Sequence, residues 1–243
     1  MEKLIYVIGT GPGDEAHFTG QAIAALKESD VIVGYTVYVD LVKEILPDKE
    51  YMTTGMTREI ERCRLCFDLA KSGKIISLVC SGDAGVYGMA SPVYELLPEY
   101  DDVEIVVVPG ITAANSGAAV LGAPLNHDYC VISLSDLLTP WEVIENRLKA
   151  AIMGDFAIAI YNPSSKNRAD YLQKACDIML ASGAKPDRAC GYVENIGREG
   201  MNSSVCTLAE LRDTSVNMFT TVFIGNSESY IQGNKLITKR GYR

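Results

Sequence analysis

The sequence predicts an α/β protein. Short apolar runs recur along its 243 residues, and each is followed by glycine, proline, serine or aspartate and then by a helical pattern. Most of these runs are apolar on both faces, which is typical of parallel strands that helices cover on both sides. With 48% hydrophobic residues, the chain can also bury a full core.

The expected elements follow in order along the chain. Strands are expected at 4–9, 30–34, 74–80, 103–109, 130–135, 155–162, 188–193 and 220–225. Helices are expected at 19–29, with Thr19 as N-cap, and at 57–72, 87–97, 111–121, 141–152 and 166–182. In the small-residue stretch 110–128, helix-forming alanines give way to a loop, and we place a domain boundary there. We therefore expect two α/β lobes, 1–118 and 119–243, with mainly parallel sheets and a ligand cleft between them.

Charge and cysteine content exclude several classes of function. The net charge of −9 disfavours a nucleic-acid partner and anionic membranes. No run reaches the roughly 18 apolar residues needed to span a bilayer, and the first apolar run is too short for a signal peptide. Seven scattered cysteines suit a reduced compartment, so we expect a cytoplasmic protein. The close pair Cys63 and Cys66 lacks a second pair, so no metal site is expected.

The first loop, "GTGPGD" at 9–14, departs from the dinucleotide-binding fingerprint. Asp14 stands where that fingerprint requires its third glycine, and Pro12 removes a backbone donor from any phosphate cradle. A nicotinamide cofactor is therefore disfavoured. A tight strand-to-helix turn without a ligand remains an alternative.

Two further loops combine small residues with a strand end. The loop "SGDAGVYGMA" at 81–90 carries Asp83, whose charge weakens a phosphate nest and favours a ligand with hydroxyls, an amine or a positive centre. In "VPGITAANSGAA" at 108–119, small residues at a helix start let a ligand approach the backbone closely. The alternative is that they only let helix and sheet pack tightly.

Taken together, the three loops resemble those of the tetrapyrrole methylase family. The patterns G-x-G-P-G-D, G-D-x-x-x-Y-G and P-G-x-T-A are met at 9–14, 82–88 and 109–113. The resemblance implies a two-lobed fold that binds S-adenosylmethionine. The sequence departs from the wider family where the second strand ends in "GYTVY", because many members have an aspartate after that tyrosine.

Other stretches are similar to the corrin-pathway members of the family, the precorrin-3B or cobalt-factor III C17-methyltransferases. They are "VGYTVYVDLV" at 33–42, "TGMTREIERC" at 54–63, "HDYCVISLSDLLTPW" at 127–141, "YNPSSKNR" at 161–168 and "ITKRGY" at 237–242. The resemblance implies methyl transfer to C-17 with ring contraction, and S-adenosylhomocysteine as product. The cysteine-rich extension of longer relatives is not seen, so no iron–sulfur cluster is expected.

The resemblance also implies a donor pocket. In the first lobe it would be lined by Pro12, Ser81, Gly82, Asp83, Val86, Thr112 and Ala113. In the second lobe, residues on strand ends would enclose the adenine: Leu134, Tyr161, Asn162, Gly191, Tyr192, Thr220 and Thr221. Asp83 would accept hydrogen bonds from the amino-acid and ribose portions of the cationic donor. For the second set, core packing alone is the alternative.

A tetrapyrrole rich in carboxylates requires cations, and ring contraction requires an acid or base. The candidate cations on one predicted helix are Arg58 and Arg62, which are four residues apart. Two further candidates, Lys166 and Arg168, follow the residues "YNPSS". For proton transfer the candidates are His127, Asp136 and Tyr35. The alternatives are that the arginines lie on a solvated helix face, that His127 is structural, that Asp136 caps a helix and that the ring of Tyr35 only packs.

Two other functions remain open at this point. One is a methyltransferase of the same fold that acts on another tetrapyrrole carbon, and the other is a non-catalytic protein that binds a tetrapyrrole or S-adenosylmethionine. The residues do not decide between a metal-free and a cobalt-containing substrate. The family resemblance implies a homodimer.

Overall fold

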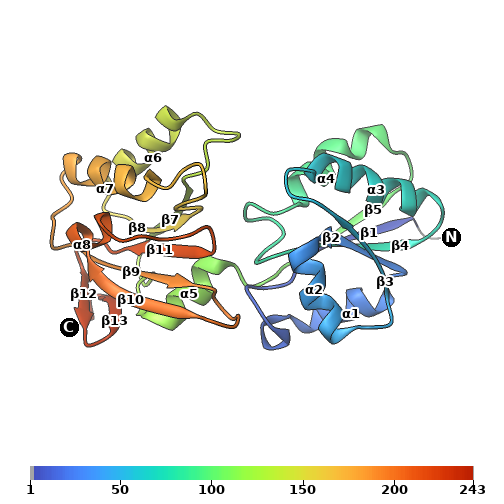
Figure 1. The fold of residues 1–243 in the computed structure, drawn as a ribbon, viewed down its shortest axis with the longest axis horizontal. Coiled ribbons are helices and arrows are strands. Elements are labelled where there is room, and N and C mark those ends of the chain that lie inside the picture. The colour runs from blue at the N-terminus through green and yellow to red at the C-terminus, as the bar shows by residue number, and fades with distance from the viewer. Residues whose placement is uncertain (1–2, 243) are drawn as a thin grey trace. The chain divides into compact units, whose positions relative to one another are not determined.

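The computed structural model describes residues 3–242, which form two compact units divided between Ala113 and Ala114. Each unit has its own β-sheet covered by helices, so the α/β class is confirmed (Figure 1). Within the described residues, no helix combines the length and the apolar character that a membrane crossing requires.

The first unit contains a five-stranded sheet in which all neighbouring strands are parallel, as predicted. The strand order is β3-β2-β4-β1-β5, so β1 lies between β4 and β5. Because the strands are parallel, their carboxyl ends meet at one edge of the sheet, where ligands bind in open α/β sheets. The strands are β1 (Leu4–Gly9), β2 (Val31–Tyr35), β3 (Glu50–Thr54), β4 (Ile75–Cys80) and β5 (Glu104–Val108).

Helices cover both faces of this sheet (Figure 1). Side chains alternate along β1, so that Ile5 and Val7 pack in one cluster with Phe67, whereas Ile8 packs in another with Leu26. Thr19 caps the first helix as predicted, because its side chain accepts a hydrogen bond from the Ala22 N–H at 3.1 Å. The helices are α1 (Gly20–Glu28) and α2 (Thr36–Ile45) on one face, and α3 (Glu59–Lys71) and α4 (Ala90–Leu96) on the other. Two short 3-10 helices, Glu15–His17 and Leu97–Glu99, complete the unit.

The second unit differs from the expectation of mainly parallel sheets. Its five-stranded sheet has the order β10-β9-β11-β8-β7, and only β7 and β8 are parallel. A strand covered on both faces has the same continuous apolar pattern in either direction, so the sequence does not reveal the antiparallel pairings. The strands are β7 (Tyr129–Ser133), β8 (Ala157–Tyr161), β9 (Ala189–Glu194), β10 (Asn202–Thr207) and β11 (Thr220–Ile224).

The helices of the second unit also lie on both faces of its sheet (Figure 1). The helix α5 (Ala113–Leu121) packs closely on one face, because a Cβ at Gly117 would lie 2.8 Å from Cζ of Phe223. The other face contacts α6 (Trp141–Met153), α7 (Tyr171–Ala181) and α8 (Leu208–Arg212). A smaller sheet contains β6 (Gly122–Ala123), β12 (Ser229–Gln232) and β13 (Lys235–Thr238) in the order β12-β13-β6.

Candidate functional site

The three glycine-containing loops meet at the carboxyl edge of the first sheet, because β4, β1 and β5 are neighbours there. The loops after β1 and β4 are joined by their backbones. Gly11 N–H donates to Gly82 O at 3.0 Å, and Gly82 N–H donates to Gly11 O at 2.8 Å. The predicted first-unit residues therefore come together in one place.

Glycine is required where these loops touch. A Cβ at Gly9 would lie 2.6 Å from Gly82 O and 2.7 Å from Gly110 N, which no side chain can occupy. A Cβ at Gly110 would collide with the same carbonyl and would lie 2.5 Å from Gly9 O. Main-chain atoms of the three loops are thus in van der Waals contact at this edge of the sheet.

Asp83 connects two of the loops. Its Oδ1 accepts a hydrogen bond from Gly85 N–H at 2.8 Å, within its own loop. Its Oδ2 accepts one from Gly110 N–H at 3.0 Å, in the loop after β5. The sequence prediction gave this carboxylate to a bound donor, whereas the structure shows both of its oxygens bonded to main-chain amides.

The predicted donor residues of the first unit lie in these three loops. A Cβ at Gly82 would point toward Thr112 and Ala113, at 3.9 Å from Cα of Thr112 and 3.8 Å from Ala113 N. Pro12 is buried beneath, and Ser81, Asp83 and Val86 are half-buried. The three loops contain no lysine or arginine, and their two carboxylates are Asp14 and Asp83. Such an arrangement fits a cationic ligand better than an anionic one.

In the second unit, several predicted residues gather where β7 and β8 end. Leu134 N–H donates to Tyr161 O at 2.9 Å, and Asn162 Nδ2 donates to Ser133 Oγ at 2.9 Å. Asn162 has a φ of 53°, a left-handed conformation that asparagine tolerates better than most residues. The hydroxyl of Tyr161 accepts a hydrogen bond from Ala114 N–H at 2.7 Å, in the first turn of α5.

β11, which is antiparallel to β8, begins with Thr220 and Thr221 at the same edge, and both threonines are buried. Other predicted residues lie away from that edge, which corrects the expectation that all of them sit on strand ends. Gly191 and Tyr192 lie in the middle of β9. A Cβ at Gly191 would lie 3.0 Å from Cδ1 of Leu121, so this glycine allows α5 to pack on the sheet. Leu134 is at the edge, but its side chain is fully buried in the core, which leaves only its backbone for a ligand.

Asp136 joins the loops that follow β7 and β8. Its Oδ2 accepts a hydrogen bond from the Tyr171 hydroxyl at 2.6 Å, and its Oδ1 accepts one from Arg168 at 3.3 Å. Arg168 also donates to the hydroxyls of Ser135 at 2.7 Å and Ser165 at 3.0 Å. The hydrogen bond from Tyr171, together with Arg168, lowers the pKa of the Asp136 carboxyl, so it is ionised at neutral pH. It does not cap α6, whose N-cap is Pro140.

The structure separates the two arginines expected on one helix face. Arg58 precedes α3 and is exposed, and its guanidinium pairs with Glu61 at 3.2 Å. Arg62 is buried, with only 4% of its surface exposed. Its guanidinium donates to Thr54 Oγ1 at 2.7 Å and to Gly55 O at 3.0 Å. Arg62 therefore secures the end of β3 and does not share a solvent-facing surface with Arg58.

The remaining predicted residues belong to separate elements of the fold. Lys166 is exposed in the loop after β8, and His127 is exposed in the connection between β6 and β7. Tyr35 ends β2 and contacts the ring of Tyr38 edge-on, with 5.4 Å between ring centroids. Tyr35 and His127 belong to different units.

The close cysteine pair lies in the core of the first unit. Cys63 and Cys66 are both buried on α3, and burial raises the pKa of the Cys63 thiol to about 11. The part of the chain that the structure describes contains no group of three or more histidine, cysteine, aspartate or glutamate side chains placed to hold a metal ion.

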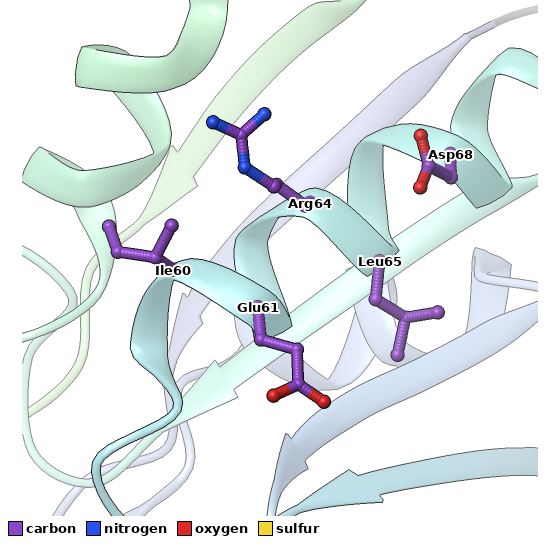
Figure 2. A pocket seen from close by; sticks show the side chains of 5 residues that line it. All are labelled: Ile60, Glu61, Arg64, Leu65 and Asp68. Atoms are coloured by element: carbon purple, nitrogen blue, oxygen red, sulfur yellow. The ribbon is translucent and has the colours of Figure 1, made fainter.

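A shallow depression of about 490 Å³ lies over the outer face of α3 (Figure 2). Arg64, one of its lining side chains, donates to Glu99 at 2.7 Å. None of the lining residues belongs to the three glycine-containing loops, so this depression is distinct from the candidate site. The side chains that line it are Ile60, Glu61, Arg64, Leu65 and Asp68.

Sequence reasoning missed several residues of these loops. The sequence identifies Gly9 and Gly110 only as parts of motifs. The structure shows that their backbones lie so close to those of neighbouring loops that no side chain is tolerated. The second-unit loops are held together by Ser133, Ser135 and Tyr171, to which no role was assigned. Ser133 and Ser135 lie in the stretch 127–141 that resembles the corrin-pathway members, whereas Tyr171 lies within the predicted helix 166–182 and outside the stretches of resemblance.

Comparisons with known proteins place these features in a wider group. A family model described as Tetrapyrrole (Corrin/Porphyrin) Methylases matches residues 4–212. The chain is 45% identical over 240 residues to a protein of Salmonella typhimurium named probable cobalt-factor III C(17)-methyltransferase, covering 98% of this chain and 99% of that protein. It is 36% identical over 235 residues to a precorrin-3B C(17)-methyltransferase of Sinorhizobium sp, covering 95% and 92%. The crystal structure of the methyltransferase CobJ matches with a TM-score of 0.90 and 37% identity, covering 97% of this chain and 99% of that chain.

Proposed function

The chain belongs to the tetrapyrrole methylase family, and from this premise we propose that it transfers a methyl group from S-adenosylmethionine to C-17 of a corrin-pathway tetrapyrrole. The observation that carries the proposal is the 45% identity, over nearly the full length of both chains, to a protein named as a cobalt-factor III C17-methyltransferase. The three loops at the carboxyl edge of the first sheet supply the candidate donor site.

The chemistry of these loops supports a sulfonium donor. S-Adenosylmethionine carries a positive sulfur, and the loops contain two carboxylates and no basic side chain. A Cβ at Gly82 would lie 3.8 Å from Ala113 N and 3.9 Å from Cα of Thr112. Because glycine has no side chain there, main-chain groups of both loops can bind the amino-acid and ribose portions. The residues of the second unit at its own loop edge, such as Asn162 and Thr221, remain a prediction for the adenine side.

The proposed reaction requires alignment more than covalent help. The electron pair of C-17 forms a bond to the methyl carbon while the carbon–sulfur bond breaks, and its electrons remain on sulfur in S-adenosylhomocysteine. The protein must hold the two centres in line, about 3 Å apart, and exclude water.

Ring contraction, implied by the family resemblance, adds a proton transfer for which His127, Asp136 and Tyr35 remain candidates. The hydrogen bond from Tyr171 lowers the pKa of Asp136, so its carboxylate could act only as a base near neutral pH.

The substrate side of the proposal requires cations near a carboxylate-rich ring. Lys166 is exposed and is free to contribute, and Arg58 contributes if its pairing with Glu61 is exchanged for a substrate carboxylate. Arg168 and Arg62 are engaged in contacts within the protein, so their proposed role is to hold loops in place.

The relatives favour a cobalt-containing substrate over a metal-free one. Identity is 45% to the protein named for cobalt-factor III and 36% to the one named for precorrin-3B. We also propose that the protein is a homodimer and that it is cytoplasmic. Light scattering tests the dimer, for which we expect twice the mass of the chain.

The first experiment is anaerobic incubation with S-adenosylmethionine and either cobalt-factor III or precorrin-3B, followed by mass spectrometry of the tetrapyrrole. We expect cobalt-factor III to gain one methyl group, about 14 Da, with release of one equivalent of S-adenosylhomocysteine. Methylation of precorrin-3B alone would reverse the choice of substrate. Binding of both compounds with no release of S-adenosylhomocysteine would favour a non-catalytic protein.

A further inference from the structure

Asp83 occupies a special position at the candidate donor site. It follows Gly82, whose φ of 69° turns the chain sharply after β4, and it precedes Ala84, which is fully buried. The half-buried carboxylate therefore lies among main-chain atoms of two loops. Within residues 3–242, its hydrogen-bond donors are two backbone amides, those of Gly85 and Gly110, and neither is a basic side chain.

The two oxygens of this carboxylate have different partners. Oδ1 closes a short turn by accepting from Gly85 N–H at 2.8 Å, two residues further along. Oδ2 accepts from Gly110 N–H at 3.0 Å, 27 residues away and in the loop after β5. Hydrogen bonds to an ionised acceptor are about twice as strong as neutral ones, so this pair is a firm link between the loops.

The glycines explain why such a link is needed. Gly9 and Gly110 must lack side chains because their backbones approach those of the neighbouring loops too closely. Glycine has the greatest backbone freedom in the unfolded chain and in loops, and no side chain at these positions can pack to fix the loop. The loops after β1 and β4 are joined by two backbone hydrogen bonds between Gly11 and Gly82. The loop after β4 is joined to the loop after β5 by the hydrogen bond that Gly110 N–H donates to Asp83.

We propose that Asp83 is a positioning residue, which fixes the loop after β5 against the loop after β4 before the donor binds. Thr112 and Ala113 lie two and three residues after Gly110, so the hydrogen bond to Gly110 sets their distance from Gly82. A pocket that is already ordered binds its ligand more tightly, because less conformational entropy is lost on binding. This inference rests on the proposed function, since it assigns the loops to S-adenosylmethionine.

Amide hydrogen exchange of the ligand-free protein tests the link itself. In Asp83→Ala, we expect the peptides that contain Gly85 and Gly110 to exchange about tenfold faster or more, as the loss of charge-assisted hydrogen bonds requires. Asp83→Asn keeps one acceptor oxygen and should show a smaller effect. Unchanged exchange in both variants, with the fold intact by circular dichroism, would overturn the proposal.

Asp30→Asn is the matched control. Asp30 accepts a hydrogen bond from Ile75 N–H at 2.8 Å, at the amino edge of the same sheet. Its replacement removes a similar carboxylate-to-backbone bond far along the strands from the loops. We expect a comparable loss of thermal stability in this variant, with exchange at Gly85 and Gly110 and the affinity for S-adenosylmethionine unchanged.

Calorimetric binding of two ligands separates positioning from direct contact with the amino-acid portion of the donor. 5′-Methylthioadenosine lacks the amino-acid portion of S-adenosylmethionine. If Asp83 acts by positioning, Asp83→Asn should weaken both ligands by a similar factor, about tenfold. Weakening of S-adenosylmethionine alone, or of neither ligand, would overturn this role. Failure of the wild-type protein to bind S-adenosylmethionine would instead refute the proposed function, while the exchange experiment would still test the link.

Discussion

Single residues at the loop edge show how backbone and side chain share the work of building the site. Gly82 has no Cβ where any other residue would place one in contact with Thr112 and Ala113, at 3.9 Å from Cα of Thr112 and 3.8 Å from Ala113 N. From the sequence, Asp83 beside it is predicted to bind the donor. The sequence does not show that its carboxylate accepts hydrogen bonds from main-chain amides instead. Its bond to Gly110 depends on the approach of two strands that only the folded sheet brings together.

A methyl group at position 82 should weaken donor binding while leaving the fold in place. In Gly82→Ala, the new Cβ enters the space beside Thr112, and the positive φ of 69° adds about 1–2 kcal/mol of strain. We expect the Kd for S-adenosylmethionine, measured by calorimetry, to rise by about tenfold or more. Gly183→Ala is the control, because Gly183 has a φ of 99° with open space around it. Equal donor affinity in the two variants would contradict this interpretation of the space.

Asp136 should make the stability of the second unit depend on pH. The Tyr171 hydroxyl and Arg168 lower the pKa of its carboxyl in the folded protein, so its stabilising effect is present above the ordinary aspartate pKa of about 3.9. The effect is lost as the pH falls through the lower pKa of the folded state. We expect the Tm of Asp136→Asn to lie below that of the wild type at pH 7, with the two values converging toward pH 3. A constant difference over this range would show that ionisation of Asp136 does not matter.

Among the strands, those predicted correctly contain a continuous apolar run in the sequence. The strands that the sequence does not predict are β3, β6, β10, β12 and β13. Of these, β3 and β10 are edges of their sheets and have mainly polar or half-exposed residues. The helix α2 was missed because "TVYVDLVKEI" is rich in β-branched residues, which have low helix propensity. It forms because Val39 and Val42 are buried against the sheet. Tertiary packing thus decides these elements, and local sequence cannot report it.

The short helix α8 depends on its N-cap residue, Thr207. The Thr207 side chain accepts from Glu210 N–H, and the Glu210 side chain accepts from Thr207 N–H at 2.8 Å, which forms a capping box. We expect Thr207→Ala to lower the free energy of unfolding by about 1 kcal/mol in urea titrations. Thr207→Ser, which keeps the hydroxyl, should be close to the wild type. A similar loss in the serine variant would mean that the methyl group, and not the cap, is responsible.

At the scale of the whole molecule, charge sets how an acidic substrate approaches. The chain has a net charge of −9, and the proposed tetrapyrrole also carries many carboxylates, so the two repel each other at long range. The three loops assigned to the donor carry no basic side chain, and the exposed cations Arg58 and Lys166 lie outside them. Attraction between the substrate carboxylates and nearby cations must therefore overcome the repulsion from the net negative charge of the protein.

Salt should consequently increase the efficiency of this enzyme toward its tetrapyrrole. Raising the ionic strength from about 0.01 M to 0.15 M shortens the screening length from about 30 Å to about 8 Å, which weakens the repulsion. We expect kcat/KM for the tetrapyrrole to rise, and kcat/KM for S-adenosylmethionine to stay level or fall. A steep decrease for the tetrapyrrole would indicate that cations near the site dominate its approach.

The contact between three glycine-containing loops also limits how this protein can change over generations. Every missense mutation at Gly9 or Gly110 adds a Cβ where main-chain atoms already touch, so no mutational path leads through these positions without breaking the junction. A neighbour such as Ile111, whose side chain is 38% exposed, has no such restriction. A deep mutational scan should therefore find intolerant and permissive codons side by side. Diversification toward new acceptors can proceed around an invariant main-chain core.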